Sequence, residues 1–97
     1  MNSVKAMNIA LAWEKGIEGR RVGDGWFAAP SRKGHEVAIR VKAPARGGPA
    51  YVERKTLNGY QHTVTITETC RDEARLRSCL EMIRVRERLA EKGGERE

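Results

Sequence analysis

Two alternating segments flank an asparagine–glycine pair in the stretch YVERKTLNGYQHTVTIT, residues 51–67. Asn58-Gly59 is typical of a two-residue type I′ turn, which needs positive φ at both central positions. The stretch therefore predicts a β-hairpin of strands 51–57 and 60–67. Closure by two residues places Tyr51 opposite Ile66.

The two faces of this hairpin differ in character. Tyr51, Val64 and Ile66 give one face the larger apolar side chains, so we expect that face to lie against helices. The other face is polar, and we expect it to be exposed as a set: Arg54, Thr56, Gln61, Thr63 and Thr65.

Two further strands are predicted before the hairpin. Residues 26–29 read Trp-Phe-Ala-Ala, a short apolar strand that Pro30 ends. Residues 36–42 alternate, with valine and isoleucine on one face and Arg40 and Lys42 on the other, which is typical of a half-buried strand. Together these segments give a three- to four-stranded antiparallel sheet.

A helix is predicted at each end of the sheet. Asn2-Ser3 can cap the first. Its apolar residues recur on more than one stripe, so we expect it to be packed between surfaces: Val4, Ala6, Met7, Ile9, Ala10, Leu11, Trp13 and Ile17. Thr69 is predicted to cap the second, which runs to about Lys92, before Gly93-Gly94.

The second helix carries two apolar stripes. The main one is expected to face the core and contains Leu76, Cys79, Leu80, Ile83 and Ala90. Met82, Val85 and Leu89 form the other, which we expect to meet the first helix or, as the alternative, a second copy of the chain. If the stripe meets a second copy, the protein self-associates as a homodimer through these three residues.

The predicted fold class is α+β: an N-terminal helix, the antiparallel sheet with its Asn-Gly hairpin, and a long C-terminal helix packed on one sheet face. Ninety-seven residues predict a single small domain, 1–97, with a flexible tail at 93–97. If Met7 is the start, residues 1–6 are dispensable. No run of 18 apolar residues and no secretory pattern occurs, so we expect a cytoplasmic protein without a membrane partner.

The positive charge is concentrated in the middle of the chain. Nineteen Lys and Arg against 13 Asp and Glu give a net charge of +6, and residues 20–62 hold nine basic and three acidic residues. Such a segment attracts polyanions, because it neutralises phosphates and releases their counterions. The alternative is a solvated basic face without a ligand. The predicted binding residues are Arg32, Lys33, Arg40, Lys42, Arg46, Arg54, Lys55 and Thr63.

No motif of catalytic or metal chemistry is present. Cys70 and Cys79 are expected on one helix, about 13 Å apart, too far for a disulfide. With His35 and His62 they lack the spacing of a zinc site, and neither histidine lies in a nucleophile motif. We therefore expect no enzymatic activity, no cofactor and no metal.

The order helix, antiparallel strands, helix is shared by double-stranded-RNA-binding domains. The second helix of those domains starts with basic, alanine-rich residues, whereas residues 70–74 here are acidic. The three-stranded sheet plus helix of integrase arm-binding and AP2-type domains, whose open sheet face enters the DNA major groove, is similar to residues 26–90 in topology alone. We assign the chain to no family.

Two functions of different class follow. The first is a small basic binding protein that engages nucleic acid or a nucleoprotein complex through a basic sheet face. The second is an accessory protein of the phage or mobile-element kind, anti-CRISPR-like, which inhibits a host or defence machinery by binding a protein target.

Overall fold

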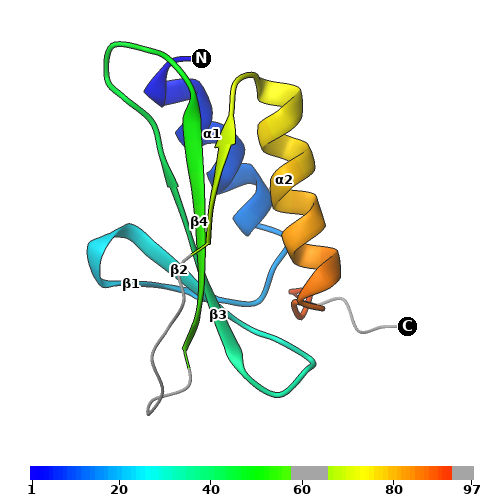
Figure 1. Cartoon of the computed structure of the whole chain (residues 1–97). Coiled ribbons are helices and arrows are strands. Elements are labelled where there is room, and N and C mark those ends of the chain that lie inside the picture. Colours follow the sequence, from blue (N-terminus) through cyan, green and yellow to red (C-terminus); the bar gives the residue numbers. More distant parts are fainter. Residues whose placement is uncertain (58–65, 93–97) are drawn as a thin grey trace.

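A computed structural model describes residues 1–57 and 66–92 of the chain (Figure 1). The overall class is α+β, as the sequence predicts. The five strands, in the order β1-β2-β3-β4-β5, form one antiparallel sheet, one strand more than the largest expected number. The elements are α1 (Ser3–Glu14), β1 (Arg20–Val22), a 3-10 turn (Gly23–Gly25), β2 (Trp26–Pro30), β3 (Glu36–Lys42), β4 (Ala50–Leu57), β5 (Ile66–Cys70) and α2 (Glu73–Arg86).

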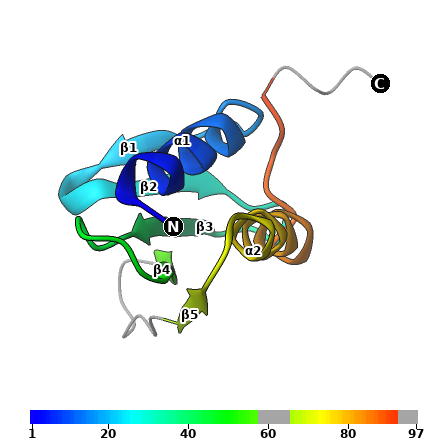
Figure 2. The same cartoon turned by 90° about the horizontal axis from the view of Figure 1, so that it is seen from above.

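Both helices pack on the same face of the sheet (Figure 2). The core between the layers contains Val37 and Ile39 of β3 and Val52 of β4, which are at most 3% exposed. Leu76 and Leu80 of α2 are fully buried against them. The opposite sheet face is covered by no helix in the described part of the chain, and we call it the outer face.

The first helix is less enclosed than its sequence predicts. Asn2 caps it, because the Asn2 Oδ1 accepts a hydrogen bond of 2.8 Å from the Lys5 backbone N–H. Ala6 is fully buried, but Val4 and Leu11 are 67% and 45% exposed. The expectation that α1 packs between two surfaces is therefore wrong, since only one side of the helix meets the core.

The second helix is shorter than expected at both ends. Thr69 lies in β5, and Asp72 caps the helix by accepting a hydrogen bond of 2.8 Å from the Arg75 N–H. The helix ends at Arg86, and Arg88 adopts a positive φ of 54°. The chain then turns back to the sheet, where the Ala90 N–H donates to the Pro30 carbonyl at 3.1 Å.

The β4–β5 register differs from the prediction. Tyr51 pairs with Thr69, three residues beyond the expected Ile66, and Arg54 pairs with Ile66. When the pairing of two strands shifts by an odd number of residues, the side chains of one strand move to the opposite face of the sheet relative to those of the other. Ile66 therefore lies on the helix side, while Tyr51 lies on the outer face, so the predicted assignment of Tyr51 to the helix side is wrong. The described residues do not include the expected Asn58-Gly59 turn, Thr63 or the expected 93–97 tail.

The second apolar stripe of α2 is divided by the fold. Met82 and Val85 are 50% and 60% exposed, so they do not pack on α1 as the sequence favours. Leu89 is buried in the core at 4% exposure, which removes it from any exposed patch.

Candidate nucleic-acid interface

The outer face gathers three of the predicted binding cations. Alternation along β3 and β4 places Arg40, Lys42 and Lys55 there, opposite the strand faces that enter the core. Across the two strands Arg40 pairs with Glu53, and Lys42 pairs with Tyr51. The predicted hairpin puts Lys55 on the face of Tyr51, toward the helices, and its position on the outer face shows that this expectation is wrong.

Trp26 of β2 lies on this face beneath two cations. The residue is only 6% exposed, and the Arg40 Cζ lies 4.3 Å and the Lys55 Nζ 4.2 Å from the ring centroid. A cation over an indole ring is stabilised by the ring quadrupole. These two side chains are therefore held in place before any ligand arrives.

Arg40 is also held by polar contacts. Its Nε donates to the Glu53 Oε1 at 2.7 Å and its Nη1 donates to the Asp24 carbonyl at 3.0 Å. Asp24 presents that carbonyl from the turn before β2, where it adopts a φ of 65°. With its charge compensated by Glu53, Arg40 contributes more to the shape of the face than to its net charge.

Lys42 is an exposed cation at one end of the face, and Arg46 is exposed beyond it. Lys42 ends β3, and Arg46 lies in the loop that follows. Neither they nor Lys55 form an ion pair within residues 1–57 and 66–92. Lys42 and Tyr51, which is 38% exposed, line a shallow pocket of about 360 Å³ on this face together with Glu53 and Thr67.

The other predicted cations lie elsewhere. Arg54 points to the helix side, where its Nη1 lies 3.0 Å from the Glu87 Oε2, so its expected exposure on the open face is wrong. Arg32 and Lys33 are exposed in the turn between β2 and β3, at the opposite end of β3 from Lys42. The eight predicted residues therefore do not form one patch, and Thr63 lies outside the described residues.

Arg20 is a cation of the outer face that the sequence analysis missed. It belongs to β1, pairs in the sheet with Ala28, and donates to the Glu36 Oε2 at 2.7 Å. This ion pair holds the pKa of Glu36 below its usual value. Asp24-Gly25, a common hairpin-turn dipeptide between Val22 and Trp26, was the sequence signal for this additional strand.

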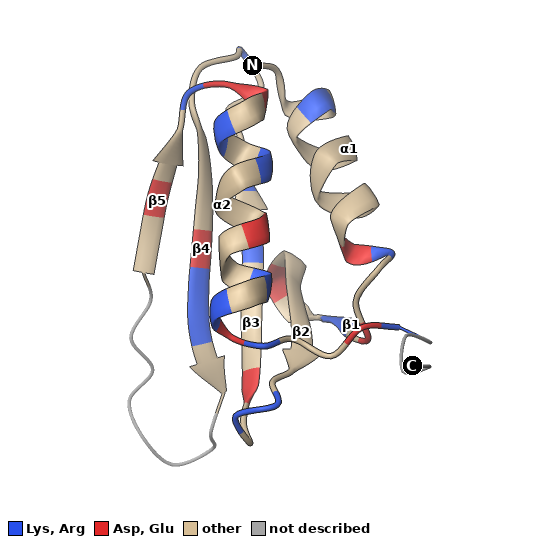
Figure 3. Cartoon of the chain, turned by 90° about the vertical axis from the view of Figure 1, so that its right-hand side faces the viewer, with Lys and Arg blue, Asp and Glu red and all other residues tan. Residues whose placement is uncertain are grey.

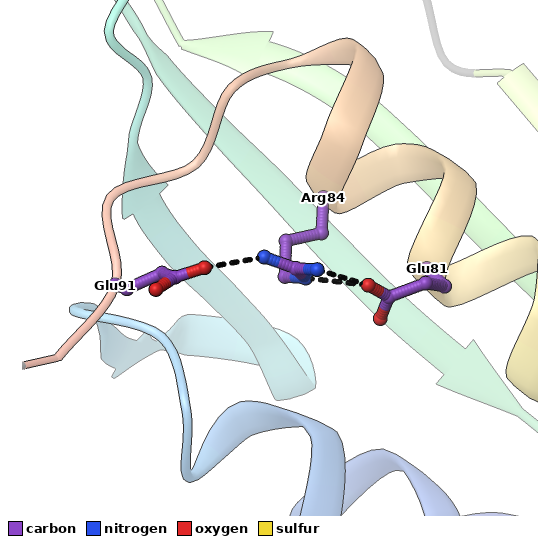
Figure 4. A network of polar contacts seen from close by, with 3 residues as sticks. All are labelled: Glu81, Arg84 and Glu91. Carbon is purple, nitrogen blue, oxygen red and sulfur yellow. Dashed lines mark hydrogen bonds and ion pairs between the residues drawn. The ribbon is translucent and has the colours of Figure 1, made fainter. Parts of the chain in front are cut away.

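Acidic and basic residues are interspersed along the helix layer (Figure 3), and several of them form ion pairs within the molecule. Arg84 of α2 donates to Glu81 one turn earlier and to the Glu91 Oε2 at 2.6 Å (Figure 4). Lys5 of α1 lies 3.1 Å from the Glu73 Oε2 of α2. Carboxylates in these pairs reduce the attraction of this layer for a polyanion.

The cysteines are placed differently from the prediction. Cys70 ends β5 and Cys79 lies on α2, so they do not share a helix, and the separation calculated for one helix does not apply. Both are free and buried, and burial raises the pKa of each thiol. The Cys79 thiol donates to the Glu68 Oε1 at 3.0 Å. These thiols are structural groups of low reactivity.

Comparison with known proteins adds no relative. No family model matches the chain, and no curated protein or solved structure is significantly similar to it. Within residues 1–57 and 66–92, no three His, Cys, Asp or Glu side chains are grouped so as to hold a metal ion. None of the helices that the structure describes has the length and apolarity needed to cross a membrane.

Proposed function

We propose that this protein is a non-enzymatic binding module that engages nucleic acid, alone or in a nucleoprotein complex, through the outer face. The observation that carries the proposal is the charge of the open side of the sheet. Five cations lie on that face or in its β3–β4 loop, against Glu36 and Glu53 on its strands and Asp24 in the turn before β2. The five are Arg20, Arg40, Lys42, Arg46 and Lys55.

Three of these cations are available for phosphate. Arg20 and Arg40 already pair with Glu36 and Glu53, whereas Lys42, Arg46 and Lys55 have no ion pair within the described residues. Three phosphate contacts on duplex DNA give a slope of about −2.7 in log K against log salt concentration. The slope counts the contacts without any assumption about sequence preference.

Neutral groups beside these cations suit a phosphate backbone. Thr67 and Thr69 of β5 are exposed on the outer face, and threonine hydroxyls donate to phosphate oxygens. Within residues 1–57 and 66–92, Tyr51 is the one large aromatic that is exposed beside them. A single-strand-binding track needs several stacking platforms. The pattern therefore favours backbone contacts to a duplex over stacking along a single strand.

The test compares two double charge reversals with the same net change. Lys42→Glu/Arg46→Glu alters the outer face, and Lys15→Glu/Lys92→Glu is the control, because those two residues are exposed where α1 ends and the chain returns. Fluorescence anisotropy with a 20-base-pair duplex, a single strand and an RNA duplex is measured over about 50 to 300 mM salt.

The outer-face variant is expected to reduce the salt slope on the duplex by about two, while the control keeps the wild-type slope. Both should retain the wild-type thermal unfolding, because exposed substitutions usually change stability by about 0.5 kcal/mol or less. Equal loss in the two variants would show attraction by net charge alone. Folded wild-type protein with no affinity for any probe at 50 mM salt would exclude the proposal.

A second candidate is the inhibitor or adaptor that binds a protein target. It is favoured by Ile66 and Met82, which are 45% and 50% exposed and line the same pocket. Apolar side chains exposed together on a small domain mark interaction surfaces. This candidate predicts tight binding to one protein partner, with no measurable affinity for DNA or RNA at physiological salt.

A further inference from the structure

A groove lies between β5 and α2 on the helix side of the sheet, away from the outer face. It has a volume of about 410 Å³. Val52, Ile66, Met82 and Ile83 supply its apolar lining. Ile66 and Met82 are half exposed, at 45% and 50%, so the groove presents apolar surface to any ligand that enters it.

The charged part of the lining is mainly cationic. Four cations line the groove against two carboxylates, and one cation, Arg54, is already paired with Glu87. The other three, Lys33, Arg75 and Arg86, form no ion pair within the part of the chain that the structure describes. The groove therefore combines an apolar surface with unneutralised positive charge.

The strand beside the groove is at the edge of the sheet. In the described residues β5 pairs on one side only, with β4. An edge strand presents unpaired backbone N–H and C=O groups that an extended segment can join. Side chains of an added strand alternate between the two faces. Every second one would lie on the side of Ile66 and Glu68, over the groove.

We propose that the β5–α2 groove binds an extended acidic segment of a partner protein, which adds to β5 as a further strand. Carboxylates of the segment pair with Arg75, Arg86 and Lys33, and its apolar side chains cover Ile66 and Met82. This inference is independent of the outer face and goes beyond nucleic-acid binding.

Charge and polarity together select this occupant. A nucleic-acid backbone matches the cations but leaves Ile66 and Met82 against charged phosphates. A second copy related by a twofold axis would bring two positively charged grooves together, which is unfavourable. An acidic segment with apolar residues satisfies both parts of the lining.

The probe is a displayed library of random twelve-residue peptides, selected on the full chain. Two matched pairs of variants locate the site. Arg75→Glu alters the groove, and Arg77→Glu changes the same charge two residues away, outside the groove lining. Met82→Glu places a charge in the groove. Val85→Glu places the same charge outside the groove, at another exposed apolar position of α2.

Selection is expected to enrich peptides with acidic and aliphatic residues. Their dissociation constants should rise at least tenfold for Arg75→Glu and Met82→Glu and less than threefold for Arg77→Glu and Val85→Glu. Bound peptide should also slow hydrogen exchange of β5 amides at residues 66–70. Lys42→Glu/Arg46→Glu should leave peptide affinity unchanged, which separates this site from the outer face.

Three results would overturn the proposal. One is a selection that yields no peptide sensitive to Arg75→Glu. Another is duplex binding that the groove variants weaken while peptide affinity stays the same, which would assign the groove to nucleic acid. The third is a wild-type dimer in analytical ultracentrifugation that Met82→Glu abolishes and Val85→Glu does not, which would assign it to a second copy.

Discussion

A cross-strand disulfide tests the register that decides which side chains reach the outer face. The perturbation is Tyr51→Cys/Thr69→Cys, made with Cys70→Ala and Cys79→Ala so that no native thiol competes. Directly paired residues have Cα atoms about 4.5 to 5.5 Å apart, within the range a disulfide spans. In this register Ile66 lies three residues, or about 10 Å, further along β5, too far to bridge to Tyr51.

The expected stabilisation follows from the closed loop. A bridge between residues 51 and 69 encloses about 19 residues, which corresponds to about 3 kcal/mol of lost chain entropy in the unfolded state. For a domain of this size that is a rise of about 12 to 24 °C in the midpoint of thermal unfolding between reduced and oxidised protein. Calorimetry measures the midpoint, and a count of free thiols measures closure.

The matched variant is Tyr51→Cys/Ile66→Cys in the same background, which bridges only in the two-residue hairpin register. Efficient closure of this variant, together with failure of the Tyr51/Thr69 variant, would restore the alternation expected from Asn58-Gly59. It would also move Tyr51 from the outer face to the core side. The candidate interface would then lose its aromatic residue.

Three further measurements address the core, an acidic side chain and the thiols. Leu80→Ala should lower the free energy of unfolding in urea by about 2 to 5 kcal/mol, because Leu80 is fully buried, whereas Leu11→Ala, at a site 45% exposed, should cost less than about 1 kcal/mol. Burial raises the pKa of Glu14, so the stability linked to its protonation is present below the unfolded pKa and is lost as pH rises through the folded pKa. Glu14→Gln should therefore become more stable relative to wild type as pH increases above about 4.5. A constant difference in the free energy of unfolding, measured in urea from pH 4 to 7, would contradict this. Cys70 and Cys79 should react with an aromatic disulfide reagent only in denaturant, because both thiols are buried with raised pKa values, and rapid labelling of native protein would be inconsistent with their placement.

The alternation of residues along the sequence was sufficient to predict a strand where that strand has one apolar and one charged face. β3 has the predicted bounds, 36–42, because Val37 and Ile39 alternate with Arg40 and Lys42. The core-facing side of β4 was harder to predict, because Tyr51 made its own face appear more apolar than the face of Val52. The charges of Glu53 and Lys55 on the Tyr51 face were the better signal, because the outer face tolerates them and the core does not.

Helix ends and ion pairs depended on contacts distant in sequence. Thr69 was a plausible cap, but β5 extends through it because that strand pairs with β4, and Asp72 caps α2 instead. Arg54 looked like an exposed strand cation, yet Glu87, 33 positions later, lies 3.0 Å from it. A segment of the chain shows how much charge it carries but not which charges are neutralised by partners from other elements.

The alternation of β4 and β5 separates the two proposed surfaces. On β4, Lys55 belongs to the outer face and Arg54 to the groove, although they are neighbours in the chain. On β5, Thr67 lies on the outer side and Glu68 on the groove side. The same strands thus contribute to both surfaces without sharing a side chain. The two proposals therefore predict that a duplex on the outer face and an acidic segment beside β5 use different side chains of this protein.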